Sequence, residues 1–239
     1  MDDSKYIDKR SFKGGIRMNF KLFIEALMKF FLGIVLVGLL LFLPGTIHYF
    51  QGWLFMGILF IPMFIAGIVL MIKNPDLLRR RLDNKEKESE QKIVILFSGI
   101  MFLSGFIVAG LNYRFQWFVL PSVVTWIGSI VFLVSYILYG EVLRENTYLS
   151  RTVGVEKDQK VIDTGMYGVI RHPMYAVTIL LFLSIPFVLG CLYSFFIFLI
   201  YPFIIIKRIK NEEEVLEKEL KGYREYQKKV KYKLIPFVW

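Results

Sequence analysis

Cysteine and histidine are scarce in this chain of 239 residues, which contains one cysteine and two histidines. Cys191 alone cannot form a disulfide framework or a cysteine-based metal site within one chain. His48 and His172 lie far apart in the sequence, and no cluster of His, Cys, Asp and Glu has the spacing of metal ligands. The sequence also shows no tandem repeat and no glycine-rich phosphate loop. We therefore expect no metal partner, no repeat scaffold and no phosphate-binding loop.

Charged side chains are absent from three long stretches, 53–72, 93–111 and 117–139. Hydrophobic residues make up 56% of the chain, more than a soluble domain of this size can bury. A bilayer core about 30 Å thick needs roughly 20 apolar helical residues, because backbone polar groups have to be satisfied within the segment. A fourth run, 30–43, extends back to Leu22 past Glu25 and Lys29, with no convincing cleavage site behind it. We predict four retained spans.

The last apolar stretch, 174–206, is divided by Gly190 and Cys191 into two short halves. This pattern predicts a tight helical hairpin. The chain is then an all-α, polytopic integral membrane protein with about six transmembrane helices, in contact with the lipid bilayer. A hairpin that enters and leaves from the same side without crossing is the alternative, and it predicts the same sidedness.

Positive charge alternates between the two sides of this predicted topology. The loops 44–52 and 189–191 contain no Lys or Arg, and 112–116 contains only Arg114. Because Lys and Arg concentrate in cytoplasmic loops, we predict that both termini are cytoplasmic. The net charge of +10 is interpreted as a topology signal and not as a nucleic-acid surface. The basic residues of the predicted cytoplasmic N-terminus and loops include Lys5, Lys9, Arg10, Lys13, Arg17, Lys21, Arg79, Arg80, Arg81, Lys85, Lys87, Arg144, Arg151, Lys157, Lys160 and Arg171.

Two polar stretches, 141–173 and 207–239, flank the hairpin and are expected to lie close together. Residues 1–140 are therefore predicted to form a four-span membrane region, and 141–239 a functional region with the hairpin and a cytoplasmic tail. Pro173 suits the first turn of a helix, whose free amides beside Arg171 and His172 can form an anion site. The alternative is that Arg171 and His172 only anchor the helix at the interface.

The second polar stretch contains a cation and a carboxylate at helical spacing. Arg208 and Glu212 are four residues apart and share one face of a continuing helix. Alone, such a pair is often an exposed ion pair of little energetic value. Further on, an apolar stripe interrupted at Gly222 predicts a cytoplasmic amphipathic helix on the membrane surface. The residues of the stripe are Leu216, Leu220, Tyr223 and Val230.

Read together, the motifs on both sides of the hairpin resemble the isoprenylcysteine carboxyl methyltransferase family of membrane enzymes. The resemblance covers roughly 141–239, and the earlier spans match only as hydrophobic helices. The order and separation of the motifs carry the resemblance. They are Thr164-Gly165, Tyr167, Arg171-His172-Pro173, Tyr175, Arg208, Glu212-Glu213, Leu216, Gly222-Tyr223, Tyr226 and the ending Lys233-Leu234-Ile235-Pro236-Phe237.

The resemblance implies that S-adenosylmethionine binds at the cytoplasmic face and that its methyl group goes to a lipophilic acceptor. In the family, the acceptor is a carboxylate on a lipid-modified cysteine. Arg208 would face this acceptor as the catalytic residue. No residue is expected to act as nucleophile, because a carboxylate already is one. The cofactor would be bound by Lys160, Val161, Ile162, Tyr167, His172, Pro173, Met174, Tyr175 and Glu212.

Two positions depart from the family pattern, and they concern the acceptor more than the reaction. Val177 stands where glycine is frequent, which would narrow the space beside the cofactor or the lipid entrance, and Gly154 stands where some members carry glutamine. One alternative is methylation of a phospholipid amine, for which His172 or Glu213 would serve as base. An alternative of another class is a transporter or a non-catalytic membrane protein, although the predicted spans lack a charged path.

Overall fold

The computed structural model describes residues 20–83, 89–150, 152–156 and 158–239. Nine of the basic residues that predict sidedness lie outside the described residues. They are Lys5, Lys9, Arg10, Lys13, Arg17, Lys85, Lys87, Arg151 and Lys157.

The described residues form nine α-helices and one short 3-10 helix, with no strand among them. Five segments are long and apolar enough to cross a membrane, and α6 is a shorter apolar helix. The predicted all-α polytopic membrane fold with about six such helices is therefore confirmed. The elements are α1 (Phe20–Phe42), α2 (Phe50–Lys73), α3 (Pro75–Leu82), α4 (Ser89–Phe115), α5 (Ser122–Glu145), η1 (Gly165–Gly168), α6 (Pro173–Val188), α7 (Leu192–Phe198), α8 (Ile200–Glu219) and α9 (Tyr223–Lys229).

Proline and asparagine set several helix boundaries. Asn74 ends α2 and starts α3, because its side-chain oxygen accepts a hydrogen bond of 3.1 Å from the Leu77 amide. Pro75 then occupies the first turn of α3, where a missing N–H costs little. Pro121 precedes α5, so this helix begins five residues after the apolar stretch does. Pro62 lies inside α2.

The predicted hairpin consists of α6 followed by α7 and α8. Its tip turns at Gly190, whose φ of +65° favours glycine. Cys191 is buried and caps α7 by accepting a bond from the Ser194 amide. The Tyr49 hydroxyl donates to the Leu189 carbonyl at 2.5 Å, which ties the tip to the turn before α2. The one cysteine of the chain thus has a structural role.

Small residues let the helices approach closely. A Cβ atom on Gly128 of α5 would lie 2.7 Å from the Phe187 Cβ and 2.9 Å from the Val188 backbone nitrogen of α6. Gly105 of α4 faces the Phe198 ring of α7 in the same way. Close backbone approach at such positions is a common source of packing energy between membrane helices. By contrast, only 6% of the residues in the apolar part of α1 are buried, so most of this helix faces outward.

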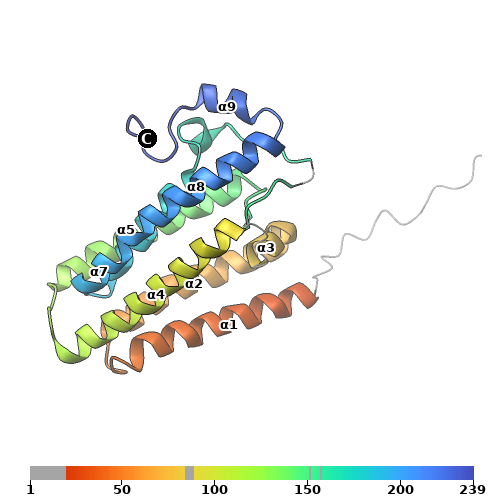
Figure 1. Cartoon of the computed structure of the whole chain (residues 1–239). Coiled ribbons are helices and arrows are strands. Elements are labelled where there is room, and N and C mark those ends of the chain that lie inside the picture. The colour runs from red at the N-terminus through yellow and green to blue at the C-terminus, as the bar shows by residue number, and fades with distance from the viewer. Residues whose placement is uncertain (1–19, 84–88, 151, 157) are drawn as a thin grey trace, which may run out of the picture.

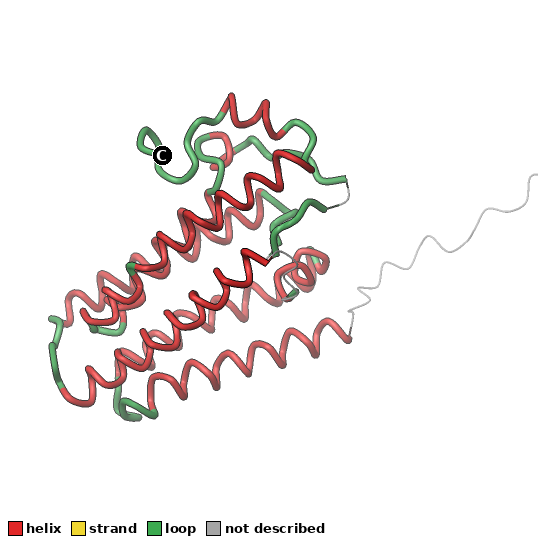
Figure 2. Tube along the Cα trace, viewed as in Figure 1, coloured by secondary structure: helices red, strands yellow, loops and turns green. Residues whose placement is uncertain are grey.

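The elements that carry polar sequence gather at one end of the bundle. Figure 1 shows the start of α1, the short helix α3 and α9 at this end, and the turns before α2 and α5 at the other. The irregular stretch between α5 and α6 also lies beside α9 (Figure 2). The predicted boundary between the two regions, at residue 140, lies inside α5. The boundary therefore divides the chain by expected function and does not coincide with the end of a helix, and it stays a prediction.

The apolar stripe of the tail is covered by protein and does not lie on a membrane surface. Leu220, Tyr223, Tyr226 and Val230 are buried in one cluster. Val155 and Val161, from the stretch between α5 and α6, and Leu216 pack against this cluster. The predicted orientation of the amphipathic helix is therefore wrong, because its apolar face covers this irregular stretch. Gly222 does interrupt the stripe, with φ of +87° before α9.

The close approach of α5 and α6 predicts a matched pair of outcomes for two glycines of α5. Gly128→Ala should lower the free energy of unfolding by roughly 1–3 kcal/mol, because its methyl group meets the backbone of α6. Gly140→Ala meets nothing within 4 Å and should raise stability by up to about 1 kcal/mol through helix propensity. Thermal unfolding in detergent measures both. A Gly128→Ala protein that unfolds at or above the temperature of Gly140→Ala would contradict this packing.

Candidate functional site

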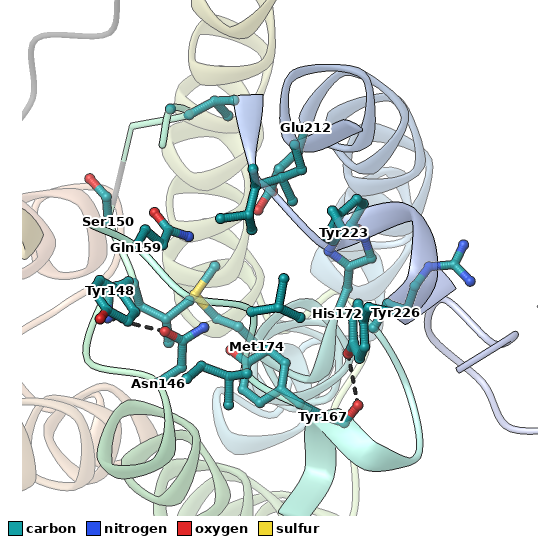
Figure 3. A pocket seen from close by; sticks show the side chains of 18 of the residues that line it. Asn146, Tyr148, Ser150, Gln159, Tyr167, His172, Met174, Glu212, Tyr223 and Tyr226 are labelled. Atoms are coloured by element: carbon teal, nitrogen blue, oxygen red, sulfur yellow. Dashed lines mark hydrogen bonds between the residues drawn. The ribbon is translucent and has the colours of Figure 1, made fainter. Parts of the chain in front are cut away.

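Two cavities lie at the polar end of the bundle. The polar one has a volume of about 90 Å³ and is enclosed by residues 146–162, the start of α6, the middle of α8, and α9. Figure 3 shows side chains from these elements pointing into it, with Met174 between Asn146 and Glu212. The second cavity has a volume of about 780 Å³ and lies among α1 to α6 and α8, with mostly apolar walls.

The polar cavity brings together nearly all the predicted site residues. Only Pro173 is absent from its wall, because this residue is fully buried in the first turn of α6. The predicted residues that line the cavity are Lys160, Val161, Ile162, Tyr167, His172, Met174, Tyr175, Arg208 and Glu212. Their roles toward a cofactor or an acceptor remain predictions.

Tyr175 joins the two charged residues of α8. Its hydroxyl donates a hydrogen bond to the Glu212 carboxylate and accepts one of 2.8 Å from the Arg208 Nε. The Arg208 guanidinium also lies 5.9 Å from the centre of the Tyr175 ring. Arg208 and Glu212 do share one helix face, as their spacing predicts. They form a connected polar group at the cavity wall, with Tyr175 between them.

Arg171 and His172 are bound by protein groups and do not form the predicted free anion site. The Arg171 Nε lies 2.7 Å from Glu213 Oε1, and the His172 Nε2 lies 3.2 Å from the same oxygen. Lys233 Nζ contacts the other oxygen at 2.6 Å. Glu213 is 5% exposed. The anion at this helix start is therefore the Glu213 side chain of the protein itself, and not the ligand anion for which the free site was predicted.

The C-terminal segment completes this network with backbone groups. The Arg171 Nη1 donates to the carbonyls of Val230 and Lys231, each at 2.8 Å. The Arg171 and His172 amides donate to the carbonyls of Tyr232 and Lys233, each at 2.9 Å. The tail therefore binds the start of α6 at four carbonyls.

Tyr167 presents an unsatisfied polar atom at this site. Its hydroxyl is buried and makes no hydrogen bond to any group in the described part of the chain. Burial raises the pKa of this phenol well above its usual value, and the nearby Asn146 side chain only partly offsets the rise. The group stays a neutral donor near pH 7. A buried hydroxyl without a partner is costly, and a bound ligand would remove that cost.

The Thr-Gly turn before Tyr167 is shaped by contact with the end of α5. Gly165 has φ of +49°, and a Cβ atom there would overlap the Glu145 carboxylate at 1.7 Å. That carboxylate accepts a bond of 3.1 Å from the Met166 amide. The Tyr226 hydroxyl donates to the Tyr167 carbonyl at 2.7 Å. Glycine in the motif therefore allows the turn to pack on α5.

Four residues line both cavities: Ser150, Met174, Tyr175 and Arg208. The polar cavity and the mostly apolar cavity therefore adjoin at the Tyr175–Arg208 pair. Val177 lines neither cavity and is buried in the core between the helices. The predicted narrowing by Val177 beside either cavity is wrong. Gly154, the other position that departs from the family pattern, lines the polar cavity.

Sequence reasoning missed much of the wall that follows α5. Asn146, Tyr148 and Gln159 point into the polar cavity in Figure 3. Tyr223 and Tyr226 also line it, although the sequence placed Tyr223 on an amphipathic surface. Polar and aromatic residues clustered directly after a span, facing a second such cluster after the hairpin, were the available signal.

The Glu213 network predicts a large loss of stability when its one anion is removed. Glu213→Gln leaves Arg171, His172 and Lys233 without their carboxylate, and breaking a buried ion pair typically costs about 3–5 kcal/mol. Glu214→Gln is the matched control, because Glu214 is exposed, and it should change stability by no more than about 0.5 kcal/mol. Denaturant unfolding in detergent measures both. Equal stability of the two variants would refute the structural role of Glu213.

Part of the chain that forms this site is similar to known proteins. Residues 123–222, from α5 to the turn before α9, match the family described as phospholipid methyltransferase. The delta(14)-sterol reductase of Mus musculus is 29% identical over 91 residues, which are 37% of this chain and 22% of the reductase. The aligned part of the chain thus spans about a fifth of that relative's length. The predicted resemblance to this superfamily of membrane methyltransferases, which includes the isoprenylcysteine carboxyl methyltransferases, is therefore confirmed over residues 123–222.

Proposed function

We propose that this protein transfers a methyl group from S-adenosylmethionine to a lipophilic acceptor, most favourably a carboxylate. The observation that carries the proposal is the meeting of a polar and an apolar cavity at Met174, Tyr175 and Arg208. A water-soluble cofactor and a membrane-dissolved acceptor can then reach one point from opposite sides. The family match over residues 123–222 supports the reaction class.

The residues of the polar cavity fit the cofactor chemically. S-adenosylmethionine, when bound, supplies a methyl group on a positively charged sulfur. The Glu212 carboxylate and the ring of Tyr175 are suited to cationic groups, and the unpartnered Tyr167 hydroxyl offers a donor. Asn146 and Gln159 add amide groups for a nucleoside.

The volume of the polar cavity requires movement before such a ligand can bind. Its 90 Å³ is well below the roughly 300 Å³ at which small-molecule sites begin. One wall, formed by residues 146–150, 152–156 and 158–162, is irregular backbone between α5 and η1. A few contacts hold it, among them the Arg80 bond to the Thr147 carbonyl and the Arg81 bond to the Ser150 carbonyl. We propose that this wall moves outward when the cofactor enters.

In this proposal, most of the rate acceleration comes from holding the acceptor and the methyl donor in the reactive geometry. A carboxylate is already nucleophilic, so no protein base is needed, and Arg208 is the group suited to orient it through paired N–H donors. Tyr175 fixes Arg208 by accepting the bond of 2.8 Å from its Nε. The apolar walls of the larger cavity exclude water from the reacting oxygen. Holding acceptor and methyl donor in one geometry is worth several orders of magnitude in rate.

Methylation of a phospholipid amine is the second candidate, because the matching family is described as phospholipid methyltransferase. This reaction needs a base that removes an ammonium proton. Glu213 is a poor base here, since Arg171, His172 and Lys233 surround its carboxylate. The His172 Nε2 also faces Glu213. The site geometry therefore favours the carboxylate acceptor.

Sidedness follows from the charge pattern as part of this proposal. The start of α1 and the end of the chain lie at the same end of the bundle as the polar cavity (Figure 1). Arg79, Arg80, Arg81 and Arg144 lie toward that end as well. With positive loops facing the cytoplasm, the site and both termini are cytoplasmic.

The cofactor assignment predicts separate effects for the two charged residues of α8. S-adenosylhomocysteine should bind the wild-type protein in detergent, and Glu212→Gln should weaken this binding by at least about tenfold, because hydrogen bonds to a charged group are strong. Arg208→Gln should leave the affinity within about threefold and remove turnover. Calorimetry with Glu214→Gln as control measures the affinities. Equal affinity in Glu212→Gln and wild type would overturn the cofactor assignment.

The nature of the methylated atom separates the two candidate acceptors. Membrane extract is incubated with the protein and S-adenosylmethionine labelled in the methyl group, and the labelled lipid is then treated with mild alkali. A methyl ester releases volatile labelled methanol, whereas a methylated amine retains its label. We expect the volatile product. Label that remains entirely on the lipid would favour the phospholipid amine.

A further inference from the structure

The apolar cavity has a charge pattern that is unusual for a lipid-like space. Three cations line it, Lys29 from α1, Arg81 from α3 and Arg208 from α8, and no Asp or Glu is among its described lining residues. Lys29 is neutralised by Glu25 at 2.7 Å. Arg81 and Arg208 lie at the end where this cavity meets the polar one, and Arg208 is hydrogen-bonded to the Tyr175 hydroxyl. A cavity with this pattern attracts an anionic and not a cationic headgroup.

Arg81 reaches the junction of the two cavities from outside the family-matching segment. Its Nη1 donates to the Ser150 carbonyl at 3.2 Å and lies 3.7 Å from the Met174 sulfur, and both of these residues line both cavities. Its Nη2 donates to the Tyr139 hydroxyl. All three partners are neutral. Arg81 is half-buried, and no ion pair to a described carboxylate accompanies it.

Comparison with Arg171 shows what is different about Arg81. Arg171 is buried with Glu213 at 2.7 Å, so its charge is compensated within the protein. Within the described part of the chain, Arg81 faces a cavity of apolar side chains and bonds to neutral acceptors. A cation held in such surroundings is costly unless an anion pairs with it. A bound anionic headgroup would provide that partner.

The guanidinium groups of Arg81 and Arg208 both lie near one region of the cavity wall. The Tyr201 hydroxyl of α8 lies within electrostatic range of both Arg81 and Arg208, and it bonds to the Thr178 hydroxyl at 3.2 Å. Tyr201 and Thr178 both line the apolar cavity. Tyr201 and Thr178 therefore add hydroxyl groups to the cavity wall that Arg81 and Arg208 also line.

We propose that Arg81 is a specificity-determining residue which, together with Arg208, binds the anionic headgroup of the lipophilic acceptor. The shared chemistry is an oxyanion on an apolar chain, either a carboxylate or a phosphate. The inference rests on the proposed function, because it assigns the apolar cavity to the acceptor. Arg81 selects the acceptor and takes no part in binding the cofactor.

The test uses the whole protein in a neutral maltoside detergent and three probes with the same chain length: laurate, dodecyl phosphate and dodecyltrimethylammonium. Binding is measured by calorimetry for wild type, Arg81→Gln and Arg79→Gln. Arg79 is the matched control, because it lies on the same helix, is exposed and pairs with Asp76. Arg81→Gln should bind at least one anionic probe about tenfold more weakly than wild type, since hydrogen bonds to charged groups are strong. Arg79→Gln should bind as wild type does.

The two anionic probes identify the source of the oxyanion. A larger loss for laurate assigns Arg81 to a carboxylate, and a larger loss for dodecyl phosphate assigns it to a phosphate headgroup. Unchanged affinity of Arg81→Gln for both anions, or tighter wild-type binding of the ammonium probe, would overturn the proposal. S-adenosylhomocysteine affinity is measured in the same variants and should be unchanged. A wild-type protein that binds the anions but not S-adenosylhomocysteine would refute the proposed function and leave the headgroup site standing.

Discussion

The polar end of this protein depends on the buried carboxylate of Glu213. Arg171, His172 and Lys233 all contact it, so the start of α6, the middle of α8 and the C-terminal segment are joined at one point. Without it, the positive charges of Arg171 and Lys233 would repel each other. Because the hairpin brings α6 and α8 side by side, this contact sets where Tyr175 and Glu212 lie. The candidate site is therefore built on an ion network that is structural.

Membrane burial imposes the second constraint. Backbone groups at membrane depth have to be satisfied by helices, so irregular backbone is confined to the ends of the bundle. The long connection between α5 and α6 lies at one end and becomes a wall of the polar cavity (Figure 2). The apolar cavity lies along the helices that lead to that end. The fold thus places a polar cavity against a mostly apolar one, with Arg208 and Tyr175 at the boundary.

Much of this arrangement was predictable from the sequence because hydrophobic length and charge alternation reflect the bilayer directly. The spans, the hairpin and the shared face of Arg208 and Glu212 follow from simple periodicity. The partner of Arg171 was not predictable, because Glu212 and Glu213 are neighbours and only the rotation of α8 decides which one turns inward. The tail stripe was misassigned for a similar reason, since an apolar face packs equally well on lipid or on Val155 and Val161. The position of Arg81 at the cavity was also not predictable, because a basic residue between two predicted spans gives no sign that it faces a cavity.

The central claim is that cofactor and acceptor meet where the two cavities join. An experimental structure of the protein with S-adenosylhomocysteine in lipid nanodiscs tests it most directly. We predict ligand density between Glu212 and residues 146–162, with that wall displaced outward, and lipid density whose polar end lies beside Arg208. Density for the nucleoside on the opposite side of the bundle, or lipid density that ends away from Tyr175 and Arg208, would contradict it.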